Sequence, residues 1–141
     1  MNTKELQIGD WVNYRGTNIQ VSSLYDKGGS NEIGWGDKES TWVNGRCIEP
    51  IPLTEEILEK NGFKIMRNQQ SYEYRGYPNG DFEVVDKCSV FFNQQRKPPF
   101  MLQVIRLLKL STEEKINLHV QYIHQLQQAF RLLGIEKEFV I

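Results

Sequence analysis

The chain has 141 residues, of which 39% are hydrophobic and 25% charged, and its 17 basic and 18 acidic residues give a net charge of −1. This length fits one domain spanning residues 1–141, and the composition is that of a folded globular protein rather than a disordered one. The balanced charge argues against proteins that coat polyanions or membrane surfaces, which carry a strong cationic excess.

The compartment is inferred from what the sequence lacks. The start, MNTKELQIGDW, has no apolar segment of the kind found in signal peptides. Residues 100–110 are the most apolar window, but polar side chains interrupt it well before the length of a membrane span. Cys47 and Cys88 are the only cysteines, and we interpret them as small buried hydrophobes rather than a disulfide. We therefore expect a cytoplasmic protein without a membrane contact.

Residues 1–50 have the pattern of several short strands separated by turns. The Asn44-Gly45 pair is the strongest hairpin signal, because both residues accept positive φ, and it predicts a hairpin between 41–43 and 46–48. The segment Ile8-Gly9-Asp10, followed by Val12, is similar to the entry into the first strand of SH3-like barrels. A small, strongly bent sheet or an SH3-like barrel is therefore expected for this part.

A short helix is predicted after the prolines at 50 and 52. Thr54 is a suitable N-cap, two carboxylates follow it in the first turn, and Asn61-Gly62 is a typical helix end. The buried face of this helix should consist of Leu53, Ile57 and Leu58.

A second strand region follows from Phe63 onward. Tyrosines alternate with charged residues over 72–77, and residues 77–81 read as a tight turn. We expect separate strands near 82–85 and 90–92, a loop over 94–99, and a strand rather than a helix over 100–110.

The C-terminal region predicts an amphipathic helix from about residue 119 to 133, ended by Gly134. Ser111 and Glu114 form a capping-box pattern, whereas residues 116–122 alternate as a strand does, so residues 112–118 stay undecided between the two structures. Residues 138–141 could add a short strand. The apolar stripe to be buried consists of Ile123, Leu126, Phe130 and Leu133.

Together these elements predict an α+β fold with short antiparallel strands, a short middle helix and a C-terminal helix packed on a sheet. The single domain can be subdivided into a barrel-like part, residues 1–50, and an α+β part, residues 51–141.

Three blocks in the same order carry a family resemblance. They are Leu6-Gln7-Ile8-Gly9-Asp10-Trp11-Val12, the run EPIPLTEEIL at 49–58, and the ending YIHQLQQAFRLLGIEKE at 122–138. They resemble a family of small uncharacterised proteins of gut bacteria and their phages or other mobile elements. The resemblance covers about a quarter of the chain. It implies a genomic setting and no particular chemistry.

No residue pattern indicates an enzyme, a metal site or a cofactor. His119 and His124 are the only histidines, and five positions apart on a helix they would point about 140° away from each other. Neither the histidines nor the cysteines have the close spacing of zinc ligands, and no nucleophile can be assigned to a base. His124 is interpreted as a hydrogen-bonded structural residue. We therefore expect no catalytic, metal or cofactor-binding residues.

One charge asymmetry points to nucleic acid. No acidic residue lies between Asp86 and Glu113, whereas this stretch carries five cations interleaved with phenylalanines. The candidate phosphate ligands are Lys87, Arg96, Lys97, Arg106 and Lys109. The competing interpretation is that these cations form the solvated outer face of alternating strands.

Aromatic residues supply a second candidate surface. Trp35, Tyr72, Tyr74 and Tyr77 are the interface candidates, with Trp42 beside them, because exposed aromatics bury a large area at a small entropy cost. Core packing is the competing role for the tryptophans. The expected function is a non-enzymatic module of a phage or mobile element that binds a protein partner or itself. The alternative is a nucleic-acid-binding accessory protein that uses residues 87–109.

Overall fold

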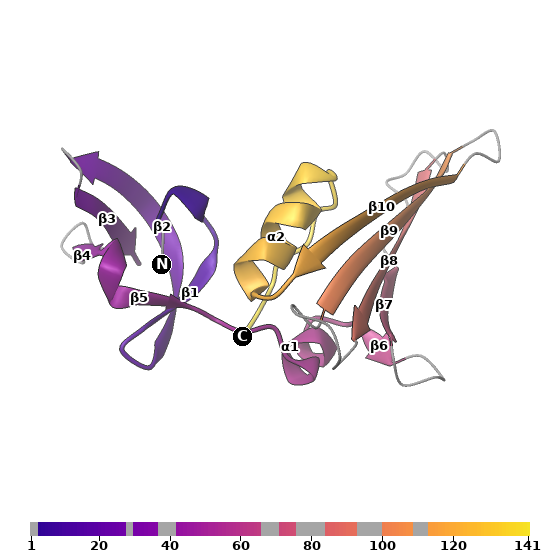
Figure 1. The fold of residues 1–141 in the computed structure, drawn as a ribbon, viewed down its shortest axis with the longest axis horizontal. Coiled ribbons are helices and arrows are strands. Elements are labelled where there is room, and N and C mark those ends of the chain that lie inside the picture. The colour runs from indigo at the N-terminus through magenta and orange to yellow at the C-terminus, as the bar shows by residue number, and fades with distance from the viewer. Residues whose placement is uncertain are drawn as a thin grey trace. The chain divides into compact units, whose positions relative to one another are not determined.

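The computed structural model describes residues 3–27, 30–36, 42–65, 71–75, 84–92, 100–108 and 113–141. It confirms the predicted α+β class, and its helices and antiparallel strands form two compact units (Figure 1). The first unit contains residues 1–52 and 122–128 together with Ile141. The second unit contains residues 53–121 and 129–140.

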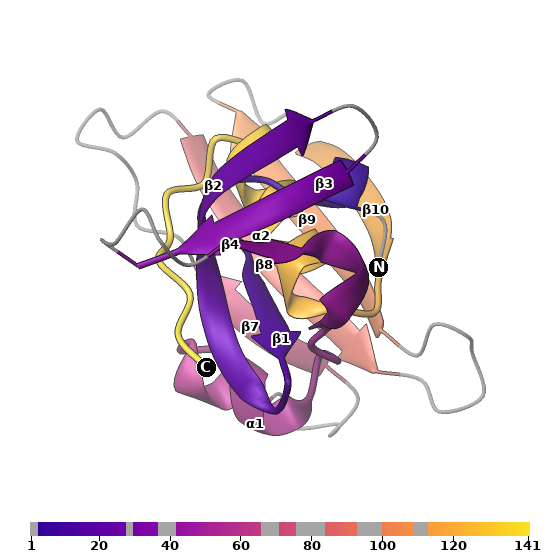
Figure 2. The same cartoon turned by 90° about the vertical axis from the view of Figure 1, so that its left-hand side faces the viewer.

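The first unit is a five-stranded antiparallel sheet with two single-turn 3₁₀ helices. Its strand order is β4-β3-β2-β1-β5, and β2 pairs with both β1 and β3 because a bulge between Val21 and Ser23 bends it (Figure 2). This order is compatible with the expected SH3-like barrel, but the sheet is not closed, since β4 and β5 form its two edges. The elements are η1 (Thr3–Glu5), β1 (Trp11–Tyr14), β2 (Thr17–Lys27), β3 (Ser30–Trp35), β4 (Trp42–Asn44), η2 (Gly45–Cys47) and β5 (Ile48–Pro50).

The tight hairpin of this sheet joins β1 and β2, whereas β4 and β5 form no hairpin. Arg15 and Gly16 both have positive φ, 49° and 85°, and form the two-residue turn between β1 and β2. The predicted Asn44-Gly45 hairpin is wrong. Asn44 has φ −64°, and its side chain accepts a hydrogen bond from the Arg46 amide, which starts η2 instead of reversing the chain.

The core of the first unit lies on one face of its sheet. Tyr14, Trp35 and Val43 pack against this core while half-buried. Cys47 is exposed, so the prediction that it is buried is wrong. The fully enclosed hydrophobic side chains are Leu6, Val12, Ile19, Val21, Ile33 and Ile48.

The second unit begins with the middle helix, α1 (Glu55–Lys60), as the sequence predicts. The Thr54 hydroxyl accepts a hydrogen bond from the Ile57 amide at 3.2 Å, and Gly62 ends the helix with φ +79°. Its predicted face is buried at Leu53, Ile57 and Leu58.

A sheet with the strand order β10-β9-β8-β7-β6 follows. The expectation of two strands near 82–85 and 90–92 is wrong, because one continuous strand, β8, pairs with β9 from Val84 to Phe92 without interruption. The predicted turn at 77–81 and the loop at 94–99 lie outside the described residues. The strands are β6 (Lys64–Ile65), β7 (Ser71–Arg75), β8 (Val84–Phe92), β9 (Phe100–Leu108) and β10 (Glu113–Val120).

Strand β9 confirms the preference for a strand over 100–110, and β10 settles the undecided segment. Residues 113–120 pair antiparallel with β9 in eight consecutive positions, so the alternating pattern prevails over the capping box. The helix α2 (Ile123–Leu132) therefore begins about four residues later than predicted. His119 lies on β10 and not on the helix.

Helix α2 buries three of the four predicted stripe residues, while Leu133 is half-buried. In the second unit, the Phe130 ring contacts Phe63 and Phe139, with ring centroids 6.1 and 5.3 Å apart. None of the described helices is long and apolar enough to cross a membrane.

The predicted terminal strand is absent from the described C-terminal residues. Instead, the buried Asn61 side chain donates to the Val140 carbonyl at 2.8 Å and accepts from the Val140 amide at 2.9 Å. A single amide side chain thus satisfies the backbone groups that a neighbouring strand would otherwise satisfy.

Candidate functional site

The outer face of β2, β3 and β4 carries the most exposed aromatic pair among the described residues. In the register, Tyr25 lies directly opposite Glu32, and Gly34 lies directly opposite Trp42. Because side chains alternate along a strand, these residues lie on the face opposite the core residue Ile33. We call Tyr25, Glu32 and Trp42 together the aromatic corner.

The two rings of the aromatic corner meet edge to face. Tyr25 is 51% and Trp42 40% exposed, their ring centroids are 6.0 Å apart, and the ring planes are inclined by 64°. The Trp42 ring lies over Gly34, where a Cβ atom would be in van der Waals contact with the ring at 3.6 Å and would collide with the Ser23 hydroxyl. The tryptophan ring therefore rests on bare backbone with much of its surface in solvent.

Glu32 supplies the charge of the corner. Its side chain is half-buried beside Tyr25, and within the described part of the chain no cation pairs with its carboxylate. A half-buried carboxylate loses part of its hydration, which makes the approach of a cationic group more favourable than at a fully exposed site.

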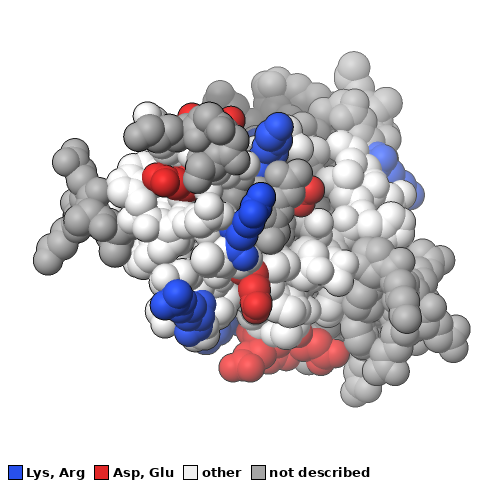
Figure 3. All heavy atoms as spheres, turned by 60° about the vertical axis from the view of Figure 1, so that its left-hand side comes forward, with Lys and Arg blue, Asp and Glu red and all other residues white. Residues whose placement is uncertain are grey.

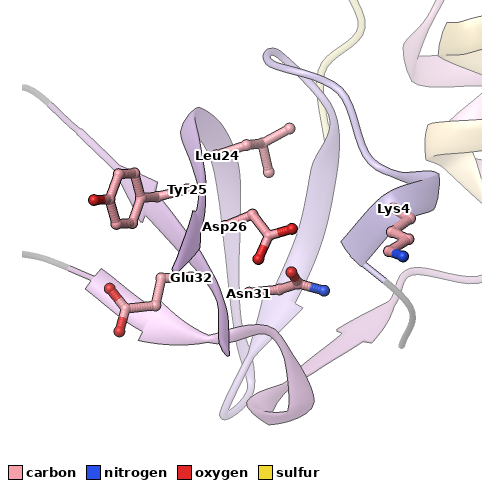
Figure 4. Close-up of a pocket in the computed structure, with 6 residues that line it drawn as sticks. All are labelled: Lys4, Leu24, Tyr25, Asp26, Asn31 and Glu32. Carbon is pink, nitrogen blue, oxygen red and sulfur yellow. The ribbon is translucent and has the colours of Figure 1, made fainter. Parts of the chain in front are cut away.

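The reverse side of the same hairpin end has a different chemistry. Figure 4 shows Tyr25 and Glu32 pointing to one side of the hairpin, and Leu24, Asp26 and Asn31 pointing to the other, toward Lys4. These six residues line a shallow hollow of about 190 Å³. It is open and small, and it supplies a polar rim rather than an enclosed ligand pocket.

Trp35, the first predicted interface residue, is only partly available. Its ring packs on Tyr14 with centroids 5.2 Å apart, and the Arg15 guanidinium lies 5.3 Å from the centre of the Tyr14 ring. Trp35 also borders an open hollow of about 460 Å³ beside Ile8 and Gly36. Its contacts with the core fit the competing interpretation of a packing residue. Tyr72 and Tyr74 lie on β7, where the structure describes backbone only, and Tyr77 lies outside the described residues.

The predicted cationic site is not assembled by the strands that the structure describes. Lys87 pairs with Ile105, and paired residues share one face of the sheet. Arg106 follows Ile105 along β9, so it lies on the other face. Arg106 is placed directly between two acidic positions, Asp86 on β8 and Glu114 on β10. Arg96, Lys97 and Lys109 lie outside the described residues. On the face that Figure 3 shows, the described Lys and Arg residues lie among Asp and Glu residues.

A buried polar cluster joins the start of β1 to α2 within the first unit. The Gln127 side chain accepts from the Trp11 amide and donates to the Gly9 carbonyl, both at 2.9 Å. Gln128 donates to the carboxylate of the buried Asp10 at 2.6 Å, and the same carboxylate oxygen accepts from the Gln7 amide at 2.9 Å. These bonds satisfy buried polar groups, which is a structural role.

His124 belongs to this region and is 2% exposed. It stacks on Tyr122 with ring centroids 5.6 Å apart, but its Nδ1 atom has no hydrogen-bond partner, so this atom does not make the hydrogen bonding predicted for a structural histidine. Burial lowers the pKa of His124, and the carboxylates of Asp10 and Glu5 oppose this effect more weakly. No group of metal ligands is found among the described residues.

The sequence reasoning missed Tyr25 and Glu32. Counting by two from the core residue Val21 places Tyr25 on the inner face, but the bulge after Val21 reverses the alternation and turns Tyr25 outward. The available signal was the apolar Leu24, which fits the inner face only if a bulge precedes it.

No family model, no curated protein and no solved structure matches this chain.

Proposed function

We propose that this protein is a non-enzymatic interaction module that binds a partner protein through the aromatic corner. The exposed Tyr25 and Trp42 pair carries the proposal. Tyrosine and tryptophan dominate the energetics of protein interfaces, because each buries a large area while fixing only two side-chain torsions. We also propose that the protein comes from a phage or another mobile element, and this part of the proposal rests on the sequence resemblance alone.

The corner is also positioned as an interface should be. It lies on the outer face of a sheet whose inner face is filled by the hydrophobic core, so its rings are not needed to close that core. A ring pair held by its own edge-to-face contact loses little freedom on binding. Self-association through the same face is the other form of the proposal.

Site-specific photocrosslinking tests the proposal. A photoreactive phenylalanine analogue replaces Tyr25 in cells that carry the gene, and the same analogue at the exposed Thr17 serves as the control. We expect a crosslinked protein at position 25 only. Its complex with the purified chain should weaken at least about tenfold in Trp42→Ala.

Light scattering on the purified protein then separates a partner from a second copy. Equal labelling at both positions, together with a monomer whose mass does not change with concentration, would rule out both forms of the proposal.

A second candidate, nucleic-acid binding, is favoured by a row of cations that the register reveals. Arg75 lies directly opposite Lys87, which lies opposite Ile105, which in turn lies opposite Lys115. Three cations thus cross one face of the second sheet. Like charges directly opposite one another destabilise a sheet, and phosphates would offset this cost.

Fluorescence anisotropy with labelled single-stranded DNA and RNA tests this candidate at about 50 mM salt, where phosphate contacts are strong. Lys87→Glu should weaken binding much more than the matched reversal Arg106→Glu, because Arg106 is already flanked by acidic positions. Absence of binding, or equal effects of the two reversals, would reject the candidate.

A further inference from the structure

The chemistry of the aromatic corner narrows the kind of partner that it fits. The two ring planes of the corner are inclined by 64°, and each of these exposed rings has an electron-rich face. A cation placed over such a face is attracted by the ring quadrupole, most strongly over tryptophan.

The carboxylate of Glu32 adds a second attraction for the same kind of group. Glu32 lies directly opposite Tyr25 in the register, and directly opposite residues have Cβ atoms about 4.5–5.5 Å apart. No cation among the described residues pairs with Glu32, and Lys4 lies on the other side of the hairpin. A ligand cation on the Tyr25 ring would therefore lie beside the Glu32 carboxylate.

We infer that the aromatic corner binds an arginine side chain presented by an extended segment of a partner protein. This inference rests on the proposed function and specifies the partner. A guanidinium is planar, so it can lie on the Trp42 ring while its edge N–H groups point to the Glu32 carboxylate. A lysine ammonium can satisfy either attraction but lacks the flat shape that combines them. Phosphate groups are disfavoured, since the carboxylate repels them.

Short peptides of defined composition test the inference. The probe is Gly-Ser-Gly-Arg-Gly-Ser-Gly with blocked termini, compared with the same peptide carrying lysine or glutamine in place of arginine. The readout is the NMR signal of the Trp42 indole N–H in the ¹⁵N-labelled full chain. We expect the arginine peptide to shift this signal with an affinity about tenfold higher than the lysine peptide, and the glutamine peptide to leave it unchanged.

Variants of the chain locate the contact. Glu32→Gln should weaken arginine-peptide binding about five- to tenfold, because only the charge is removed. Asp26→Asn is the matched control, since this carboxylate points to the other side of the same hairpin, and it should leave the affinity within twofold. Trp42→Leu should abolish binding, and its unchanged amide spectrum outside β3 and β4 would show that the fold persists.

The outcomes separate this inference from the proposed function. If a crosslinked partner depends on Trp42 but not on Glu32, and the arginine peptide causes no shift, the inference is wrong and the proposed function stands. If the arginine peptide binds as expected but position 25 captures no partner, the recognition chemistry stands and the proposed function fails. A Trp42 shift produced by a labelled oligonucleotide and not by the arginine peptide would overturn the inference.

Discussion

The two sheets of this protein differ in chain order at one strand, β5. In the second unit, β6 to β10 pair strictly in sequence, so each strand pairs only with its neighbours in the chain. In the first unit, β1 lies between β2 and β5, and its partner Pro50 is far along the chain from Val12. A meander needs only local reversals, whereas the first sheet must also bring β5 back to β1.

This difference shows where the molecule depends on distant contacts. The first unit takes residues 122–128 from α2, and Gln127 reaches backbone groups that lie 116 and 118 positions away. Forming such contacts has a larger loop-closure cost than pairing neighbouring strands. The second unit's sheet is therefore expected to form with fewer long-range requirements than the first.

Two buried leucines, one in each unit, should give the largest effect. Leu126 and Leu102 are fully buried, and replacing either with alanine should lower the free energy of unfolding by about 2–5 kcal/mol. Urea melts measure the loss, and amide hydrogen exchange at Val12 and Val90 reports on the two units. Leu126→Ala should accelerate hydrogen exchange mainly at the Val12 amide. Equal acceleration at both amides would show that the two units unfold as one, and a loss within about 0.5 kcal/mol would show that the helix is peripheral.

The distant hydrogen bonds of the first unit should contribute less. Gln127→Leu keeps the bulk of the side chain but leaves the Trp11 amide and the Gly9 carbonyl without this partner, so we expect a loss of about 1–3 kcal/mol. The control is Gln20→Leu, which removes one exposed bond to the same Gly9 carbonyl and should cost less than about 0.5 kcal/mol. Equal losses would mean that burial of Gln127 has no energetic role.

The buried histidine should make the first unit sensitive to acid. Burial holds the pKa of His124 below 6.5 in the folded protein. As the pH falls below 6.5, this histidine is therefore protonated in the unfolded chain before it is protonated in the folded chain. Stability should thus be constant above the unfolded pKa and decline through the window beneath it. Urea melts between about pH 5 and 8 measure this slope, kept above the range where carboxylates titrate. His124→Gln should flatten the slope.

The smallest effect is expected at the β1–β2 turn. Arg15 has a left-handed backbone, φ +49°, which arginine adopts at a cost and asparagine adopts readily. Arg15→Asn should remove this cost and stabilise the protein by about 0.5 kcal/mol. The loss of the contact between Arg15 and the Tyr14 ring reduces this gain. A thermal melt detects the change, and a lower melting temperature would show that the contact with Tyr14 outweighs the backbone strain.

The sequence predicts best where its signals are local. The helix α1 is recovered almost residue for residue, because Thr54, Glu55 and Gly62 act within one turn of its ends. The α+β class follows in the same way from local hydrophobic patterns. At residues 113–120 two local patterns disagreed, and pairing with β9 decided between them, which no local signal reports.

The candidate site was less accessible to sequence reasoning. Trp42 was visible as one of several aromatics, but nothing local showed that its ring lies over Gly34 from another strand. Tyr25 was hidden by the bulge in β2, which changes the alternation without leaving a glycine or proline as a marker. The hairpin predicted at Asn44-Gly45 is wrong for a related reason, because the asparagine side chain caps a 3₁₀ turn instead.

The bonds from Gln127 and Gln128 to the region of Gly9 and Asp10 also affect how the protein is made. Translation proceeds from the amino end, so the first five strands leave the ribosome well before these glutamines have been synthesised. A fragment ending at Pro52 would contain every strand of the first sheet and still lack these partners for Gly9, Asp10 and Trp11. Anyone who wishes to produce this unit alone should therefore append residues 122–128 through a linker rather than cut the gene after codon 52.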